Sequence, residues 1–104
     1  MTDKDLDARI GAAWSAHYEG HNDAAIQQFN EILRVEPANV DANWGLGLAY
    51  LGLDQNEKAR EIFVKVKGLI EQEIARENSA TAGRFVMLNR MVDQQLARLD
   101  ENLT

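Results

Sequence analysis

Two segments of this 104-residue chain match each other when one is shifted along the other by 34 residues. The shift places Gly20, Asn22, Ala25, Phe29 and Ile32 on Asp54, Asn56, Ala59, Phe63 and Val66. A period of this length is typical of a unit of two helices joined by a turn, which cannot bury its apolar face alone. The repeat therefore predicts that neighbouring helix pairs stack on each other.

The stretch from Leu46 to Phe63 contains a more detailed motif. Its packing residues are a large-then-small pair, an aromatic ring, an alanine and a bulky partner, namely Leu46, Gly47, Tyr50, Ala59 and Phe63. The only proline, Pro37, lies where one helix should end and the next begin. These features resemble the tetratricopeptide repeat family over roughly residues 7–67, with about two repeats and a C-terminal helix. The resemblance implies an all-α, right-handed superhelix of antiparallel helix pairs, with a signature of Gly20, Ala25, Phe29, Pro37, Leu46, Gly47, Tyr50, Ala59 and Phe63.

Apolar spacing and capping residues predict about five helices and no strand. Thr2 and Asn39 precede the first and third helices, and their side chains can accept a hydrogen bond from the first helical turn. Asn22 and Asn56 are expected to cap the second and fourth helices in the same way. We expect one domain over residues 1–104, with repeat 1 at about 5–37, repeat 2 at about 39–77 and a capping helix at about 80–103.

The second repeat has Glu71 where the first has Pro37, so its second helix should continue to about residue 77. The small, polar segment 77–83 then predicts a turn, and one continuous helix through Ser79 and Gly83 is the alternative. The last helix carries one apolar stripe of Phe85, Leu88, Val92, Leu96, Leu99 and Leu103, widened by Val86, Met87 and Met91. The stripe should pack on protein, either on this chain's own repeats or on a second copy. The two methionines are interpreted as core, or alternatively as an adaptable contact surface.

The resemblance also implies a binding groove. In the family, the first helix of each pair lines a concave groove and the second forms the outer wall. Carried over to this chain, the groove residues are Ile10, Trp14, His17, Tyr18, Trp44, Leu48 and Leu51, beside Asp7 and Asp41. This surface is apolar and aromatic, and it lacks the Lys, Arg and Asn that hold a C-terminal carboxylate in other family grooves. It favours a helix or an extended peptide as the ligand. The alternative is that the chain's own last helix fills the groove.

Charge and composition argue against several other classes of protein. The net charge is −6, from 17 acidic and 11 basic residues, whereas nucleic-acid binding requires clustered Lys and Arg. The chain has no cysteine, which excludes a disulfide framework and cysteine-ligated zinc. The acidic first residues lack the apolar core of a secretory signal, and no apolar run approaches the ~20 residues that span a bilayer. We expect a cytoplasmic protein that contacts neither nucleic acid nor membrane.

No catalytic, cofactor or metal site is predicted. His17 and His21 lie four residues apart near Glu19, but Gly20 should end the helix between them and separate their side chains. The glycines of segment 45–52 follow no predicted strand, so a nucleotide-binding loop is not expected. No nucleophile, base and orienting group occur together, so the chain is predicted to be non-enzymatic.

The leading hypothesis is an adaptor that binds an unidentified protein or peptide through its groove. The first alternative is a structural homo-oligomer, with a homodimer favoured, because two repeats are fewer than the roughly three that usually make a stable stack. The second alternative is a small secretion-type chaperone, which the repeat resemblance and the acidic charge allow. Such chaperones typically have a third repeat, which this chain lacks.

Overall fold

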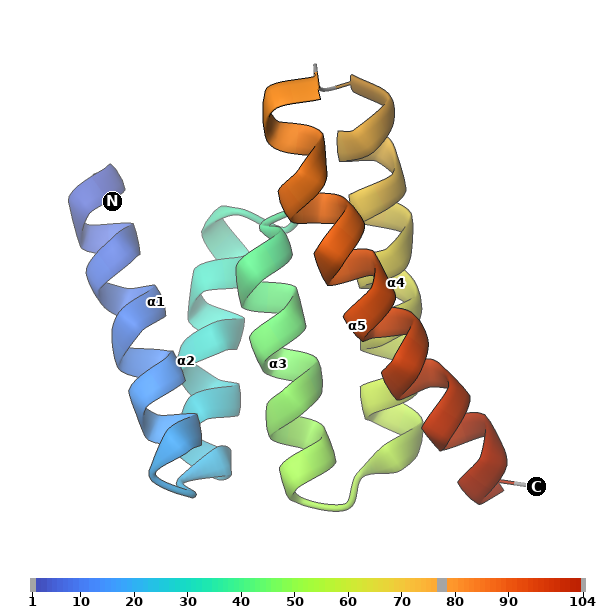
Figure 1. Ribbon diagram of the computed structural model, residues 1–104. Helices are drawn as coiled ribbons and strands as arrows, with labels where there is room; N and C mark the ends of the chain where they lie inside the picture. The colour runs from blue at the N-terminus through green and yellow to red at the C-terminus, as the bar shows by residue number, and fades with distance from the viewer. Residues whose placement is uncertain (1, 77–78, 104) are drawn as a thin grey trace.

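The computed structural model describes residues 2–76 and 79–103, and this part of the chain folds into five α-helices (Figure 1). The helices are α1 (Asp3–Tyr18), α2 (Asn22–Val35), α3 (Val40–Gly52), α4 (Asn56–Arg76) and α5 (Ser79–Leu103). Successive helices run in opposite directions, so that α1 pairs with α2, α3 pairs with α4, and α5 folds back along α4 (Figure 1). The predicted all-α fold of antiparallel helix pairs is confirmed. The alternative of a helix through Ser79 and Gly83 is correct for these residues, which belong to α5, but α5 folds back along α4 and does not continue it.

Side-chain caps begin α1 and α3 as predicted. The Thr2 hydroxyl accepts a hydrogen bond from the backbone N–H of Asp5 at 3.2 Å, and the Asn39 amide oxygen accepts one from Ala42 at 2.8 Å. Each bond satisfies an N–H group that has no partner within the first helical turn. Thr2 and Asn39 are therefore confirmed as caps.

The cap predicted at Asn22 is wrong. Asn22 is the first residue of α2, and His21 occupies the capping position without a side-chain hydrogen bond. The Asn22 amide oxygen lies 2.6 Å from Nδ1 of His17 at the end of α1, and the same side chain lies against Gly52 at the end of α3. Asn22 therefore connects three helix ends, because this tertiary contact uses the oxygen that would otherwise cap α2.

Replacing Asn39 with alanine is expected to lower the free energy of unfolding by about 1 kcal/mol, since loss of a side-chain cap typically has this effect. Asn39→Asp retains an acceptor oxygen and is the matched control, expected to stay close to the parent. Urea unfolding followed by circular dichroism measures both. Equal midpoints for the parent and Asn39→Ala would contradict the role of this cap.

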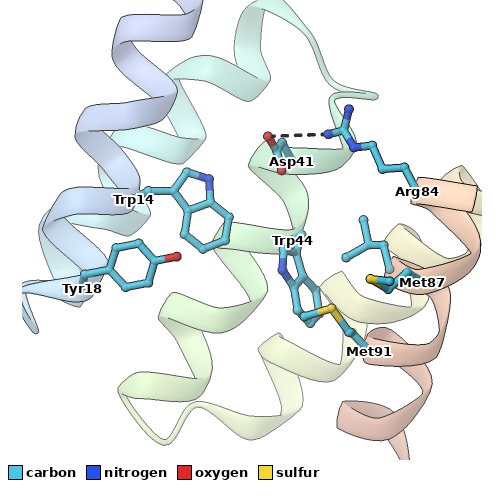
Figure 2. A pocket seen from close by; sticks show the side chains of 8 residues that line it. Trp14, Tyr18, Asp41, Trp44, Arg84, Met87 and Met91 are labelled. Carbon is cyan, nitrogen blue, oxygen red and sulfur yellow. Dashed lines mark ion pairs between the residues drawn. The ribbon is translucent and has the colours of Figure 1, made fainter. Parts of the chain in front are cut away.

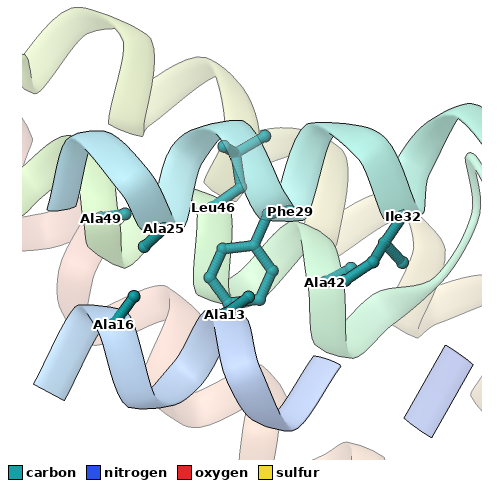
Figure 3. Packing of buried hydrophobic residues seen from close by; sticks show 8 residues of the cluster. All are labelled: Ala13, Ala16, Ala25, Phe29, Ile32, Ala42, Leu46 and Ala49. Carbon is teal, nitrogen blue, oxygen red and sulfur yellow. The ribbon is translucent and has the colours of Figure 1, made fainter. Parts of the chain in front are cut away.

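Two apolar clusters form the core. The first lies between α1, α2 and α3 and contains Ala13, Ala16, Ala25, Phe29, Ile32, Ala42, Leu46 and Ala49 (Figure 3). The second joins α3, α4 and α5 and contains Trp44, Ala59, Phe63, Val66, Ile70, Val92 and Leu99. Each cluster has one fully buried phenylalanine from the second helix of its pair, Phe29 or Phe63. The 34-residue repeat therefore places the same large ring in the middle of each cluster.

Two glycines let α3 pass close to both phenylalanines. A Cβ atom added to Gly47 would lie 2.5 Å from Cε1 of Phe63, and one added to Gly45 would overlap the ring of Phe29. A shift of 34 residues maps Gly45 onto Gly11, where an added Cβ would meet nothing within 4 Å. The difference arises because, in the described part of the chain, no helix packs on α1 at the place where α2 packs on α3.

The last helix, α5, packs on α4. Val92 and Leu99 are buried in this contact, and Phe85, Leu88 and Leu96 of the same stripe are half-buried. Leu103 lies outside the residues whose side chains the structure describes. The segment predicted as a turn, 77–83, is already helical from Ser79 onward, and residues 77–78 lie outside the described part of the chain.

Ion pairs border the contact between α4 and α5. Lys67 lies 2.6 Å from Asp93, and Arg60 lies 2.7 Å from Asp100. The hydrogen bond from Lys67 to Asp93 raises the pKa of the lysine ammonium, against a smaller opposing effect of burial. The helix α5 packs along α4, and the predicted groove residue Trp44 of α3 lies buried in the same cluster as Val92 and Leu99 of α5. The last helix therefore covers part of the α3 side of the predicted groove, whereas Tyr18 on the α1 side stays exposed. None of the helices in the described residues is long and apolar enough to span a bilayer.

Candidate functional site

An open pocket of about 450 Å³ lies between α1, α3 and α5 (Figure 2). Its lining residues are Trp14 and Tyr18 from α1, Asp41 and Trp44 from α3, and Arg84, Met87, Leu88 and Met91 from α5. The helices α1 and α3 are the first members of their pairs, and α5 occupies the equivalent place after the second pair. The pocket is open because α5 makes its helix contacts with α4 and leaves space in front of α3.

The α1 wall of the pocket consists of two stacked rings. Trp14 and Tyr18 are four residues apart, which places them on the same face of the helix. Their ring centroids are 5.8 Å apart with an interplanar angle of 28°. Trp14 is half-buried and held edge-on against Phe29 at 5.5 Å, whereas Tyr18 is 78% exposed. The core thus fixes the tryptophan, and the tyrosine extends this surface into solvent.

Trp44 from α3 forms the floor of the pocket. Its ring lies 5.3 Å from that of Phe63, and only 6% of the residue is exposed. Trp44 therefore belongs mainly to the core and presents a small part of its ring to the pocket. Asp41 lies one turn earlier on the same helix, with its side chain half-exposed at the upper edge of the pocket (Figure 2).

The α5 wall supplies two exposed methionines. Met87 is 68% exposed and Met91 is 44% exposed, so their interpretation as core residues is wrong. The α5 residues that face α4 are instead those around Val92 and Leu99, and the methionines lie on the flank toward α3 (Figure 2). Thioether side chains are flexible and polarizable, so this wall can adapt to the shape of a ligand.

Arg84 connects α5 to α3 at the edge of the pocket. Its guanidinium lies 3.9 Å from the Asp41 carboxylate, and both side chains are substantially exposed, at 68% and 46%. Exposed pairs at this separation contribute little to stability, below about 1 kcal/mol. Both charges therefore remain accessible to a ligand.

The structure brings together some of the predicted groove residues and leaves others out. Trp14, Tyr18, Trp44 and Asp41 line the pocket, whereas Ile10, His17, Leu48 and Leu51 do not. Ile10 packs on the first core cluster, and Leu48 and Leu51 pack on the second. The ring of His17 forms a hydrogen bond with the side chain of Asn22.

The four α5 residues of the pocket were not predicted as groove residues. The methionine pair, at a spacing of four residues, was the available signal for this wall, because it places two soft apolar side chains on one helix face. Which way that face points depends on how α5 packs on α4, and the sequence alone carried no signal for this.

The polar groups of the residues that line the pocket are one carboxylate, one guanidinium, the hydroxyl of Tyr18 and the indole N–H groups of Trp14 and Trp44. Within the described residues there is no group of three or more His, Cys, Asp or Glu side chains that could hold a metal ion. His21 lies 3.6 Å from Glu19 in a solvent-exposed position and does not line the pocket. The arrangement offers contacts for binding an apolar or charged side chain.

A comparison with known families gives one match. A family model described as tetratricopeptide repeat matches residues 16–70, slightly more than half of the chain. The matched segment contains α2, α3 and most of α4, which carry the repeated phenylalanines and the two close-packed glycines. No curated protein and no solved structure matches the chain.

Proposed function

The chain belongs to the tetratricopeptide repeat family, and we propose that it is a non-enzymatic adaptor that binds a protein segment in the pocket between α1, α3 and α5. Repeats of this family generally mediate protein–protein interaction. The observation that carries the proposal is the exposure of Tyr18, Met87 and Met91 around the rigid floor formed by Trp44.

The physical argument is the combination of rigid and adaptable apolar surface. Trp14 and Trp44 are held in place by the phenylalanines of the core, so ordering them on binding has little entropic cost. The exposed methionines adjust to the ligand and are enriched, like aromatic residues, in protein interfaces. A helix or an extended peptide that fills this pocket would release water from all three walls, which favours binding.

The test is a pair of matched substitutions on α5. Met87→Asn combined with Met91→Asn replaces two apolar side chains of the pocket with uncharged polar ones and is expected to weaken binding of a peptide ligand by at least about tenfold. Val86→Asn is the control, because Val86 is 44% exposed on the same helix and does not line the pocket. Ligands come from a random-peptide display selection against the parent protein. Binding is followed by tryptophan fluorescence, since both tryptophans of the chain line the pocket.

The result is read together with the urea midpoint of each variant. Loss of binding in the methionine variant, with an unchanged midpoint and a normal control, would support the proposal. Full binding by that variant would contradict it. A second copy of the chain is the alternative occupant of the pocket, because the same exposed methionines could pair across a dimer. A dimer in light scattering that dissociates on the double methionine substitution would favour this alternative.

A further inference from the structure

The α1 and α3 side of the pocket consists of aromatic surface. Trp14 and Tyr18 are stacked on the α1 wall, and Trp44 of α3 forms the floor (Figure 2). The face of an aromatic ring is electrostatically negative, so it attracts an ammonium or guanidinium group within about 6 Å of its centroid, and tryptophan does so most strongly. The large exposed fraction of Tyr18 makes part of this surface available.

The positions of the charged side chains in the pocket also favour a cation on its aromatic side. The charged side chains that line it, among the described residues, are Asp41 on the aromatic side and Arg84 on the methionine side. Helical spacing extends this polarity beyond the pocket, since Asp7 precedes Trp14 by two turns and Arg98 follows Met91 by two turns. The acidic side of the groove therefore coincides with its aromatic side.

The Asp41 carboxylate is available to a ligand cation. Its contact with Arg84 is long, at 3.9 Å, and solvent screens it. Arg84 also lies over the ring of Phe85, at 5.5 Å, and this contact does not depend on Asp41. A ligand cation beside Asp41 would replace Arg84 as the partner of this carboxylate, in a pocket that the rings of Trp14 and Tyr18 also line. The net charge of −6 favours the approach of such a ligand over long range.

We infer that the protein segment bound in this pocket presents an arginine or lysine side chain, held by the rings of Trp14 and Tyr18 and by the carboxylate of Asp41. The inference rests on the proposed function and specifies the chemistry of the partner. The apolar side chains next to that cation contact Met87 and Met91.

The experiment uses acetylated and amidated pentapeptides that differ only at their central residue, which is arginine, norleucine or glutamate. None contains tryptophan, so the fluorescence of Trp14 and Trp44 reports binding to the full-length protein. The arginine peptide is expected to bind about two- to tenfold more tightly than the norleucine peptide, and the glutamate peptide should bind most weakly.

Two substitutions with opposite expected effects sharpen the test. Asp41→Asn should weaken binding of the arginine peptide about two- to tenfold, and Arg84→Gln should strengthen it by a similar factor, because Arg84 competes for the same carboxylate. The controls are Asp23→Asn and Arg90→Gln, which change the net charge equally at exposed positions that do not line the pocket. They should leave binding close to that of the parent.

Each alternative outcome has a distinct meaning. Equal binding of the arginine and norleucine peptides would overturn the cation inference and leave the pocket as the binding site. Preference for the glutamate peptide, lost in Arg84→Gln, would assign an acidic partner segment and overturn the inference as well. A third outcome would overturn the proposed function itself. In this outcome none of the three peptides binds the folded protein, and the double variant at Met87 and Met91 binds the display-selected peptides as tightly as the parent does.

Discussion

Gly47→Leu is expected to lower the free energy of unfolding by about 3 kcal/mol, at the upper end of the usual cost of overpacking a core. Even the first carbon of the new side chain would lie 2.5 Å from the ring of Phe63, and leucine adds three more carbon atoms. Phe63 is fully buried, so its ring is enclosed by neighbouring side chains and cannot turn out into solvent without separating them. The helices α3 and α4 would have to separate, which would loosen the whole second cluster.

The matched control is Gly11→Leu, the same substitution in α1. An added Cβ at Gly11 meets nothing within 4 Å, and leucine is a better helix former than glycine. This variant is expected to be as stable as the parent or slightly more stable. Urea unfolding measures both variants. Equal losses at the two positions, or an unchanged midpoint for Gly47→Leu, would contradict the close approach of α3 to Phe63.

Removal of Ser79–Thr104, which contains α5, is expected to give an aggregating or partly unfolded protein. The helix α5 covers the face of α4 that carries Val66 and Ile70, both fully buried in the complete chain. Without α5 these side chains would form a contiguous exposed apolar patch, which is typical of aggregation-prone surfaces. Light scattering and circular dichroism compare the shortened and complete proteins.

The control for this truncation keeps α5 and removes only two ion pairs between α5 and α4. Arg60→Gln combined with Lys67→Gln eliminates the contacts to Asp100 and Asp93, which are substantially exposed and should contribute below about 1 kcal/mol each. This variant should remain folded and soluble, because Val92 and Leu99 still bury the interface. A shortened chain that is soluble, monomeric and as stable as the parent would show that α5 is not part of the core.

Residue type and spacing were enough to predict the helices and the packing within each helix pair. The 34-residue period placed Phe29 and Phe63 in equivalent positions, and both lie at the centre of a core cluster. Thr2 and Asn39 were correctly predicted as caps. These features follow from interactions within a few turns of helix or within one repeat, where residue type and spacing decide the geometry.

The α5 wall of the pocket followed only from tertiary packing, whereas Trp14, Tyr18, Asp41 and Trp44 were already expected from the sequence. The apolar stripe of α5 would have the same residue spacing whether α5 packed on α4, lay across the groove or packed on a second copy of the chain. Only its packing on α4 leaves Met87 and Met91 exposed and brings Arg84 to within 3.9 Å of Asp41, 43 positions earlier in the chain. Asn22 was mispredicted for the same reason, since its partner His17 belongs to another helix. Such contacts depend on the angle and offset between helices, which are set by the summed packing of many side chains and carry no local sequence pattern.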